Sequence, residues 1–143
     1  MGLLTEYFAA PDDAIAAAVA STHGPAGQGL PTVDAYGIEP FVQIGTLEEI
    51  LTGRPYDRIA AAQPDPVASI DGGEVLVTRL TDTVVTALAD LDDPRLPEVA
   101  ARWAATEEFW GATDPAALAD LLRALRGLAA GRGTAALYCW LSV

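Results

Sequence analysis

The strongest constraint on the fold is an uncharged apolar run near the C-terminal end of the chain. Residues 135–141 read Ala-Ala-Leu-Tyr-Cys-Trp-Leu, with no charged residue and no alternation of apolar and polar side chains. Successive side chains of a strand point to opposite faces of its sheet, so an unbroken apolar run is typical of a strand covered on both faces. We therefore expect residues 135–141 to form the central strand of a sheet.

The rest of the chain predicts strands that lead into helices. Runs of β-branched and aromatic residues indicate strands at 3–8, 40–44 and 74–80. The predicted helix starts carry side chains that commonly satisfy free backbone N–H groups: Asp12, Thr81, Asp114 and the capping-box pair Thr46 and Glu49. These segments predict a single α+β domain over residues 1–143. We expect about four strands in a mixed sheet, five helices packed on it, and the C-terminal strand at its centre.

Two segments predict irregular connections between these elements. Residues 22–37 hold several glycines and prolines and cannot continue the preceding helix, and residues 63–73 form a second turn-rich stretch. Loops as long as the first are often functional or disordered in compact domains. The 22–37 loop is therefore either a candidate part of a binding site or a disordered connection.

The charge of the chain excludes some functions more clearly than it indicates others. The 143 residues include 20 acids against eight basic residues, all of them arginine, for a net charge of −12. Nucleic-acid affinity depends on basic side chains that neutralise phosphates, so we expect no nucleic-acid partner. A negative field attracts basic protein surfaces instead. Many of the acids fall at helix starts or in turns, where an acid has a structural reason, so charge alone is weak evidence for such a partner.

Composition and local pattern also bear on the compartment. A single cysteine, Cys139, excludes an intramolecular disulfide and any multi-cysteine metal site. No basic residue precedes the first apolar stretch, and acids follow it at once, which is not the pattern of a secretory signal. The longest uncharged apolar run, 134–143, is too short to span a membrane. We expect a cytoplasmic protein with no membrane association, no metal and no cofactor.

Several short motifs occur in an order that is similar to the YfbM-like family of small bacterial proteins. They are Met1-Gly2, Tyr7-Phe8-Ala9 at the end of a strand, Leu51-Thr52-Gly53 at the end of a helix, Asp71-Gly72-Gly73-Glu74, and Arg79-Leu80-Thr81 at the start of a helix. The resemblance implies an α+β fold with an apolar terminal strand and brings no catalytic motif with it. The chain departs from the family pattern at Arg54-Pro55-Tyr56, where its connection to the next helix is shorter.

Two residues are candidates for catalysis. His23, the only histidine, is a candidate general base or metal ligand, but its position is more typical of a helix end that bonds the last carbonyl groups. Glu107 shares a predicted helix face with Trp103, and a carboxyl against an aromatic ring can act as a general acid. The alternative is an aromatic stripe in the core with solvated glutamates beside it. Cys139 lies in the most apolar segment, which favours a small hydrophobe over a reactive thiol.

Two groups of residues are candidates for binding. Arg54, Tyr56 and Arg58 belong to the only dense arginine cluster, which can grip a carboxylate or phosphate or can simply complement a helix C-terminus. Trp103 and Trp110 recur at helical spacing and predict either core or a contact face. The second reading includes a dimer face, so the oligomeric state stays open.

Two functions from different classes follow. The preferred one is a non-catalytic module of the inhibitor or immunity type that binds a basic protein partner. The alternative is a small enzyme or small-ligand-binding protein whose site lies near the 22–37 loop and the Trp103–Trp110 helix. A pocket that gathers His23, an arginine and Glu107 would favour the alternative.

Overall fold

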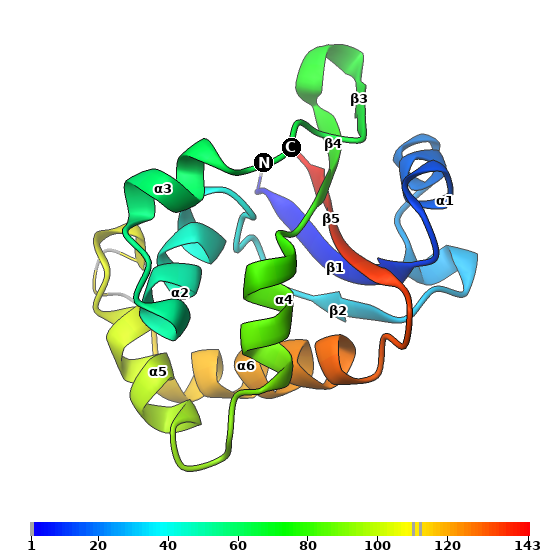
Figure 1. The fold of residues 1–143 in the computed structure, drawn as a ribbon. Coiled ribbons are helices and arrows are strands. Elements are labelled where there is room, and N and C mark those ends of the chain that lie inside the picture. The colour runs from blue at the N-terminus through cyan, green and yellow to red at the C-terminus, as the bar shows by residue number, and fades with distance from the viewer. Residues whose placement is uncertain (1, 110, 112) are drawn as a thin grey trace.

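The molecule is built on one antiparallel sheet, which the computed structural model describes over residues 2–109, 111 and 113–143 (Figure 1). Within these residues the sheet has five strands in the order β2-β1-β5-β4-β3, and every pair of neighbours is antiparallel. The strands are β1 (Leu4–Ala10), β2 (Thr32–Asp34), β3 (Ala68–Ile70), β4 (Val75–Arg79) and β5 (Ala136–Ser142).

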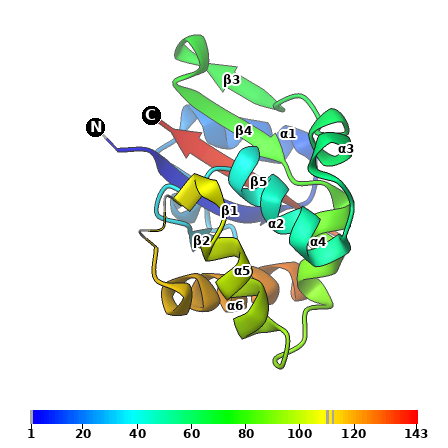
Figure 2. The same cartoon turned by 90° about the vertical axis from the view of Figure 1, so that its left-hand side faces the viewer.

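Six α-helices occur in the described part of the chain and lie unequally on the two faces of the sheet (Figures 1 and 2). They are α1 (Asp13–Ala18), α2 (Val42–Thr52), α3 (Tyr56–Ala61), α4 (Asp82–Ala89), α5 (Leu96–Ala104) and α6 (Pro115–Ala130). Helices α2, α4, α5 and α6 enclose a large core on one face. Helix α1 and the 3₁₀ helix η1 (Val19–Ser21) cover a smaller core on the other face.

The C-terminal strand is central, as the apolar run predicts. Strand β5 pairs with β1 on one side and with β4 on the other, and residues 137–141 are buried. Leu137, Cys139 and Leu141 belong to the large core, whereas Tyr138 and Trp140 belong to the small one. Both faces of β5 are covered, which is why the run needs no polar residue.

The helix starts confirm three of the predicted caps. The side chains of Asp12, Thr81 and Asp114 accept hydrogen bonds from the backbone N–H groups of Ile15, Val84 and Ala116, at 2.8, 3.3 and 2.9 Å. Helix α2 ends at Gly53, whose φ of 75° is a left-handed conformation that favours glycine. These caps depend on local contacts, so their sequence signals are reliable.

The expected strand at 40–44 is wrong, because the chain there is already helical. Helix α2 begins at Val42, and the carboxylate of Glu39 accepts hydrogen bonds from the N–H groups of Phe41, Val42 and Gln43. Three donors on one carboxylate start the helix before Thr46, the expected first cap. Thr46 lies inside the helix, where its hydroxyl donates to the carbonyl oxygen of Gln43 at 2.9 Å.

The strand count and the mixed sheet also need correction. Strand β2 lies in the expected 22–37 loop and β3 in the expected 63–73 connection, so the described sheet has five strands where about four were predicted. Each of the two is three residues long and pairs on one side only. The short helix α3 was also missed, because it occupies the segment read as an arginine cluster.

Candidate functional site

The largest hollow that we describe is an open groove between the β2 edge of the sheet and helix α6. Its volume is about 810 Å³. One wall is β2 with the turn that follows it, and the other is the outer side of α6, which runs beside β2 in both views (Figures 1 and 2). The lining residues are Thr32 to Ile38, Gln43, Glu108, Phe109 and Thr113, with Ala117, Leu118, Asp120, Leu121 and Ala124 from α6.

The β2 wall is fixed by contacts to the neighbouring strand. The Tyr7 hydroxyl donates to the carbonyl oxygen of Ile38 at 2.8 Å, and the Thr5 hydroxyl accepts from the N–H of Gly37 at 3.0 Å. Just before these two anchored residues, the Asp34 carboxylate accepts a hydrogen bond from the N–H of Tyr36 at 2.9 Å and closes a tight turn. Tyr36 adopts a φ of 52° and is 87% exposed, so its ring stands free beside the groove.

The α6 wall combines a buried side with an open one. Leu118 and Leu121 pack into the large core, whereas Ala117 and Ala124 are exposed. Small side chains at these two positions leave the groove wide. Asp120 is exposed on the same wall and pairs with Arg123 at 2.9 Å.

The charge along the groove is negative. Asp34, Glu108 and Asp120 line it, and none of its described lining residues is basic. Glu6, on the neighbouring strand β1, is the direct cross-strand partner of Asp34. Partial burial and the Asp34 carboxylate raise the pKa of Glu6 above its ordinary value. An unbalanced negative potential therefore surrounds this edge of the sheet.

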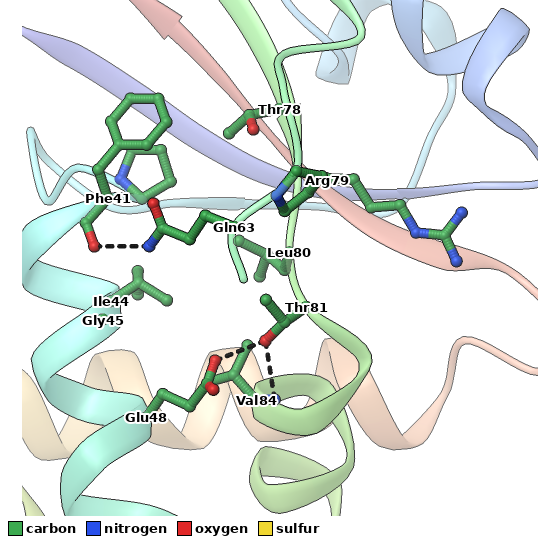
Figure 3. Close-up of a pocket in the computed structure, with 12 residues that line it drawn as sticks. Phe41, Ile44, Gly45, Glu48, Gln63, Thr78, Arg79, Leu80, Thr81 and Val84 are labelled. Atoms are coloured by element: carbon green, nitrogen blue, oxygen red, sulfur yellow. Dashed lines mark hydrogen bonds between the residues drawn. The ribbon is translucent and has the colours of Figure 1, made fainter. Parts of the chain in front are cut away.

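A second, much smaller hollow lies between α2 and the start of α4 (Figure 3). It has room for about 20 Å³, enough for one water molecule. The buried Glu48 carboxylate accepts the Thr81 hydroxyl hydrogen at 2.5 Å, and the same hydroxyl caps α4. The Arg79 side chain points away from Glu48 (Figure 3). Glu48 therefore stabilises the start of α4, where the helix dipole favours an acid.

The candidate catalytic residues do not converge. Glu107 is exposed in the 3₁₀ helix η4 (Glu107–Phe109), and neither it nor His23 lines the groove. His23 precedes Gly24, which lies against Glu6 and the Trp140 ring on the small-core face. The Cys139 thiol is on the large-core face, fully buried, and burial raises its pKa. The sheet thus separates Cys139 from the His23 segment, and burial in an apolar core disfavours the thiolate form that a reactive cysteine needs.

The candidate binding residues also lie outside the groove. Arg54 and Arg58 are exposed around α3, and an Arg54 guanidinium N–H donates to the Thr83 hydroxyl at 3.4 Å. The Tyr56 ring packs on α2 at Gly45, where an added Cβ would lie 2.8 Å from a ring carbon. That contact explains the glycine and gives Tyr56 a packing role.

Trp103 belongs to the core in this structure. Its side chain has no exposed surface, its indole N–H donates to the carbonyl oxygen of Gln43 at 2.9 Å, and it meets Phe109 edge to face. Trp110, expected on the same stripe, lies outside the described residues. The buried ring of Trp103 offers no surface to a ligand.

Two further features bear on the class of the protein. No group of three His, Cys, Asp or Glu side chains within the described residues is arranged to hold a metal ion. Among the same residues, every helix is too short or too polar to cross a lipid bilayer.

Comparison with known proteins gives no relative from which a function can be carried over. The chain matches no protein-family model, no curated protein and no solved structure. The groove is therefore the feature of this chain that bears most directly on its function.

Sequence reasoning placed a site near the 22–37 loop but missed the residues that form it. The groove joins Thr32–Ile38 to Ala117–Ala124, segments that are far apart in the chain. One local signal was available, because the β-branched pair Thr32-Val33 followed by Asp34 and Gly37 is typical of a short strand that ends in a turn.

Proposed function

We propose that the protein is a non-catalytic binding module of the inhibitor or immunity type, which uses the β2–α6 groove to hold a basic surface of another protein. One observation carries this proposal: the groove is open, Asp34, Glu108 and Asp120 line it, and none of its described lining residues is basic. Of these three acids only Asp120 is paired with a described arginine, the exposed Arg123 outside the lining. Such an arrangement complements a cationic partner, and it steers that partner toward the groove from a distance.

The whole chain strengthens the local field. With a net charge of −12, the long-range attraction for a basic protein adds to that of Asp34, Glu108 and Asp120. Attraction of this kind speeds association and weakens steeply with salt, because exposed charges are screened over about 10 Å at 0.1 M ionic strength. The same charge argues against a nucleic-acid partner.

A small-ligand-binding function is the second candidate, and one observation favours it. The groove volume of about 810 Å³ falls within the range of small-molecule sites, and its position near the 22–37 loop is where this alternative expected a site. Against it, small-molecule sites bury most of their ligand and converge a few polar groups on it. The open groove does not gather His23, Glu107 and an arginine, the combination expected for an enzyme.

The proposal extends to the family and the cellular location of the protein. We propose that the chain is related to the YfbM-like family, because it shares the short motifs quoted above; this relationship implies a fold but no catalytic chemistry. A cytoplasmic location is favoured by the single, buried cysteine, because proteins of oxidising compartments commonly use disulfides.

Photo-crosslinking from the groove tests the proposed function. Tyr36, exposed beside the groove, is replaced by p-benzoyl-phenylalanine, and Ile15, exposed on α1, receives the same replacement as a matched control. Both variants are irradiated in lysate of the source organism at low salt and at about 0.5 M salt, where the screening length is only a few ångströms. We expect position 36 alone to crosslink a basic protein, at low salt only.

Follow-up with the purified partner then separates binding from inhibition. The partner should bind the wild-type protein directly, and its own activity should fall when the complex forms. The proposed function is overturned if position 36 gives no adduct, if both positions give the same adducts, or if the adduct is an acidic protein whose crosslinking does not depend on salt.

A further inference from the structure

The outer edge of β2 carries backbone groups without partners. The N–H of Ala9 donates to the carbonyl oxygen of Pro31, and the N–H of Ala35 donates to that of Thr5, each at 3.0 Å. With the register Tyr7↔Val33, residues 31, 33 and 35 therefore direct their backbone groups toward β1. The N–H and C=O groups of Thr32 and Asp34 consequently point away from β1, toward the open edge.

Nothing in the described part of the chain pairs with these outward groups. Strand β2 is the last in the sheet, and no backbone hydrogen bond from another described residue reaches Thr32 or Asp34 on that side. An unpaired strand edge is a template for a further strand, and proteins usually cover or blunt such an edge. Here it borders the groove.

The groove supplies a floor for a further strand. The side chain of Val33 lies on the face of the sheet that packs on the large core, next to α6. A residue added beside Val33 would rest on Ala117, Leu121 and Ala124, which line the groove at that side. These side chains are small or apolar, so the position beside Val33 suits an apolar side chain.

The opposite face of the same edge suits a basic side chain. Glu6 and Asp34 are direct cross-strand partners, and like charges in that arrangement destabilise a sheet. A residue added opposite Asp34 would lie beside this pair of carboxylates. A cation there would form a favourable cross-strand pair and relieve the repulsion.

We propose that β2 accepts an extended segment of the partner protein as a sixth, antiparallel strand, in which basic side chains facing Glu6 and Asp34 alternate with apolar side chains that enter the groove. The inference rests on the proposed function and specifies how the partner is held. Strand addition supplies affinity through main-chain hydrogen bonds and specificity through alternate side chains. The antiparallel direction follows the four ladders already present.

A second copy of this chain is a poorer occupant of the edge. Pairing β2 with β2 would bring two chains of net charge −12 together and add a second Glu6–Asp34 pair to the first. Like-charge juxtaposition of that kind disfavours association. The edge therefore fits a cationic segment of a different protein.

Synthetic peptides of alternating lysine and valine, nine residues long and fluorescently labelled, test this inference with the full-length protein. In an antiparallel pair, residues opposite Asp34 and Thr32 share their face and exchange both backbone hydrogen bonds with them. The lysine N–H groups would therefore face β2, and the valine N–H groups would face away. We expect N-methylation of the lysine amides to weaken binding at least ten-fold and N-methylation of the valine amides to change it less than two-fold.

A protein variant tests the same bonds from the other side. Thr32→Pro removes an outward N–H without removing a bond to β1, and Thr32→Val is the matched control that keeps the N–H. We expect Thr32→Pro to weaken peptide binding about ten-fold and Thr32→Val to leave it within two-fold. Should Thr32→Pro fail to fold, slower amide hydrogen exchange at Thr32 and Asp34 in the wild-type complex replaces it.

The outcomes separate this inference from the proposed function. Peptide binding that is insensitive to every N-methyl group, or lost only when valine amides are methylated, overturns antiparallel strand addition. The absence of any peptide binding also overturns it. A dimer of this chain in sedimentation that Thr32→Pro dissociates overturns it as well, because β2 would then pair with a second copy of the chain. In each of these cases crosslinking at position 36 to a basic protein leaves the proposed function standing. An absence of both peptide binding and crosslinking overturns the two together.

Discussion

The two faces of the sheet are built from the same strands but differ in kind. The face covered by α2, α4, α5 and α6 holds a continuous apolar core, and its aromatic donors Tyr7 and Trp103 are both bonded to backbone carbonyl oxygens. The other face, covered by α1 and η1, is thin and mixes apolar with polar groups. There the Trp140 indole N–H is buried without a partner among the described residues. We infer from this comparison that the large core contributes most of the free energy of unfolding. The small core contributes less, because burying a polar group such as the Trp140 N–H without a hydrogen bond is unfavourable.

The largest expected effect removes the strand that both faces share. Deleting residues 138–143 takes away most of β5 and exposes the inner edges of β1 and β4. We expect the truncated chain to be insoluble, because both cores lose their central strand. Deleting Val143 alone, which is 67% exposed, is the control and should leave a soluble protein. Soluble yield and circular dichroism measure the result; a truncated chain with an unchanged Tm would contradict the central role of β5.

The same substitution on each face compares the two cores directly. Trp103→Phe should destabilise by about 3 kcal/mol, since it opens a cavity in the core and removes the indole hydrogen bond to the Gln43 carbonyl. Trp140→Phe also opens a cavity, but it removes a buried N–H that has no described partner, so we expect a net change below about 1 kcal/mol. Urea unfolding measures both. Equal losses would mean that the two faces contribute alike.

A polar contact on the thin face gives a smaller effect. The Tyr138 hydroxyl donates to the Asp13 carboxylate at 2.6 Å and links β5 to α1. Tyr138→Phe should cost about 1 kcal/mol, the usual net value of a hydrogen bond that stays partly solvated. The matched control is Tyr36→Phe, because the exposed Tyr36 hydroxyl should contribute almost nothing to stability. A substitution of the neighbouring Leu137 by Phe would not serve, because it would overpack the large core.

The same tyrosine predicts a dependence on alkaline pH. Burial, and then the bond to Asp13, raise the pKa of Tyr138 above its ordinary value of 10.0. The folded state therefore holds the proton after the unfolded chain has lost it, so the free energy of unfolding falls as pH rises above about 10. We expect wild type to lose stability more steeply than Tyr138→Phe above that pH. Parallel curves for the two proteins would contradict the assignment.

The smallest expected effect is a gain. Burial and Asp34 raise the pKa of Glu6 above 4.5, so its ionised form is disfavoured in the folded state, and stability falls as pH rises through the folded pKa. Glu6→Gln should therefore raise stability at pH 7 by about 0.5 kcal/mol, a typical value for a like-charged cross-strand pair. The gain should vanish below about pH 4. Asp34→Asn tests the other member of the pair. Combining it with Glu6→Gln should raise the free energy of unfolding little further, because either substitution alone removes the repulsion.

Sequence reasoning succeeded where the signal was local. The apolar run at 135–141 predicted the central strand, and Asp12, Thr81 and Asp114 predicted helix starts that their own side chains cap. In each case the residues that carry the signal also make the contact. Such contacts do not depend on how distant segments are arranged.

Prediction from the sequence failed where a contact with a distant or competing residue determines the local structure. Strands β2 and β3 are short and exist because β1 and β4 pair with them, which no local pattern reports. The β-like run at 40–44 became helical because Glu39 caps three N–H groups ahead of it. The groove follows the same rule, since Asp34 and Asp120 meet there only through the fold. The charge composition indicated the kind of partner, and the tertiary structure supplied the surface.

The central position of β5 has a consequence for biosynthesis. A ribosome makes β5 after each of the strands β1 to β4, yet β1 and β4 meet only through it. While the chain is still emerging, β1–β2 and β3–β4 are two separate hairpin-like pairs with bare inner edges. Pairing Thr5 with Leu141 closes a very long loop, and contacts of that sequence separation are slow to form. The nascent chain therefore carries the unpaired inner edges of β1 and β4 until β5 arrives, and unpaired strand edges of this kind favour aggregation.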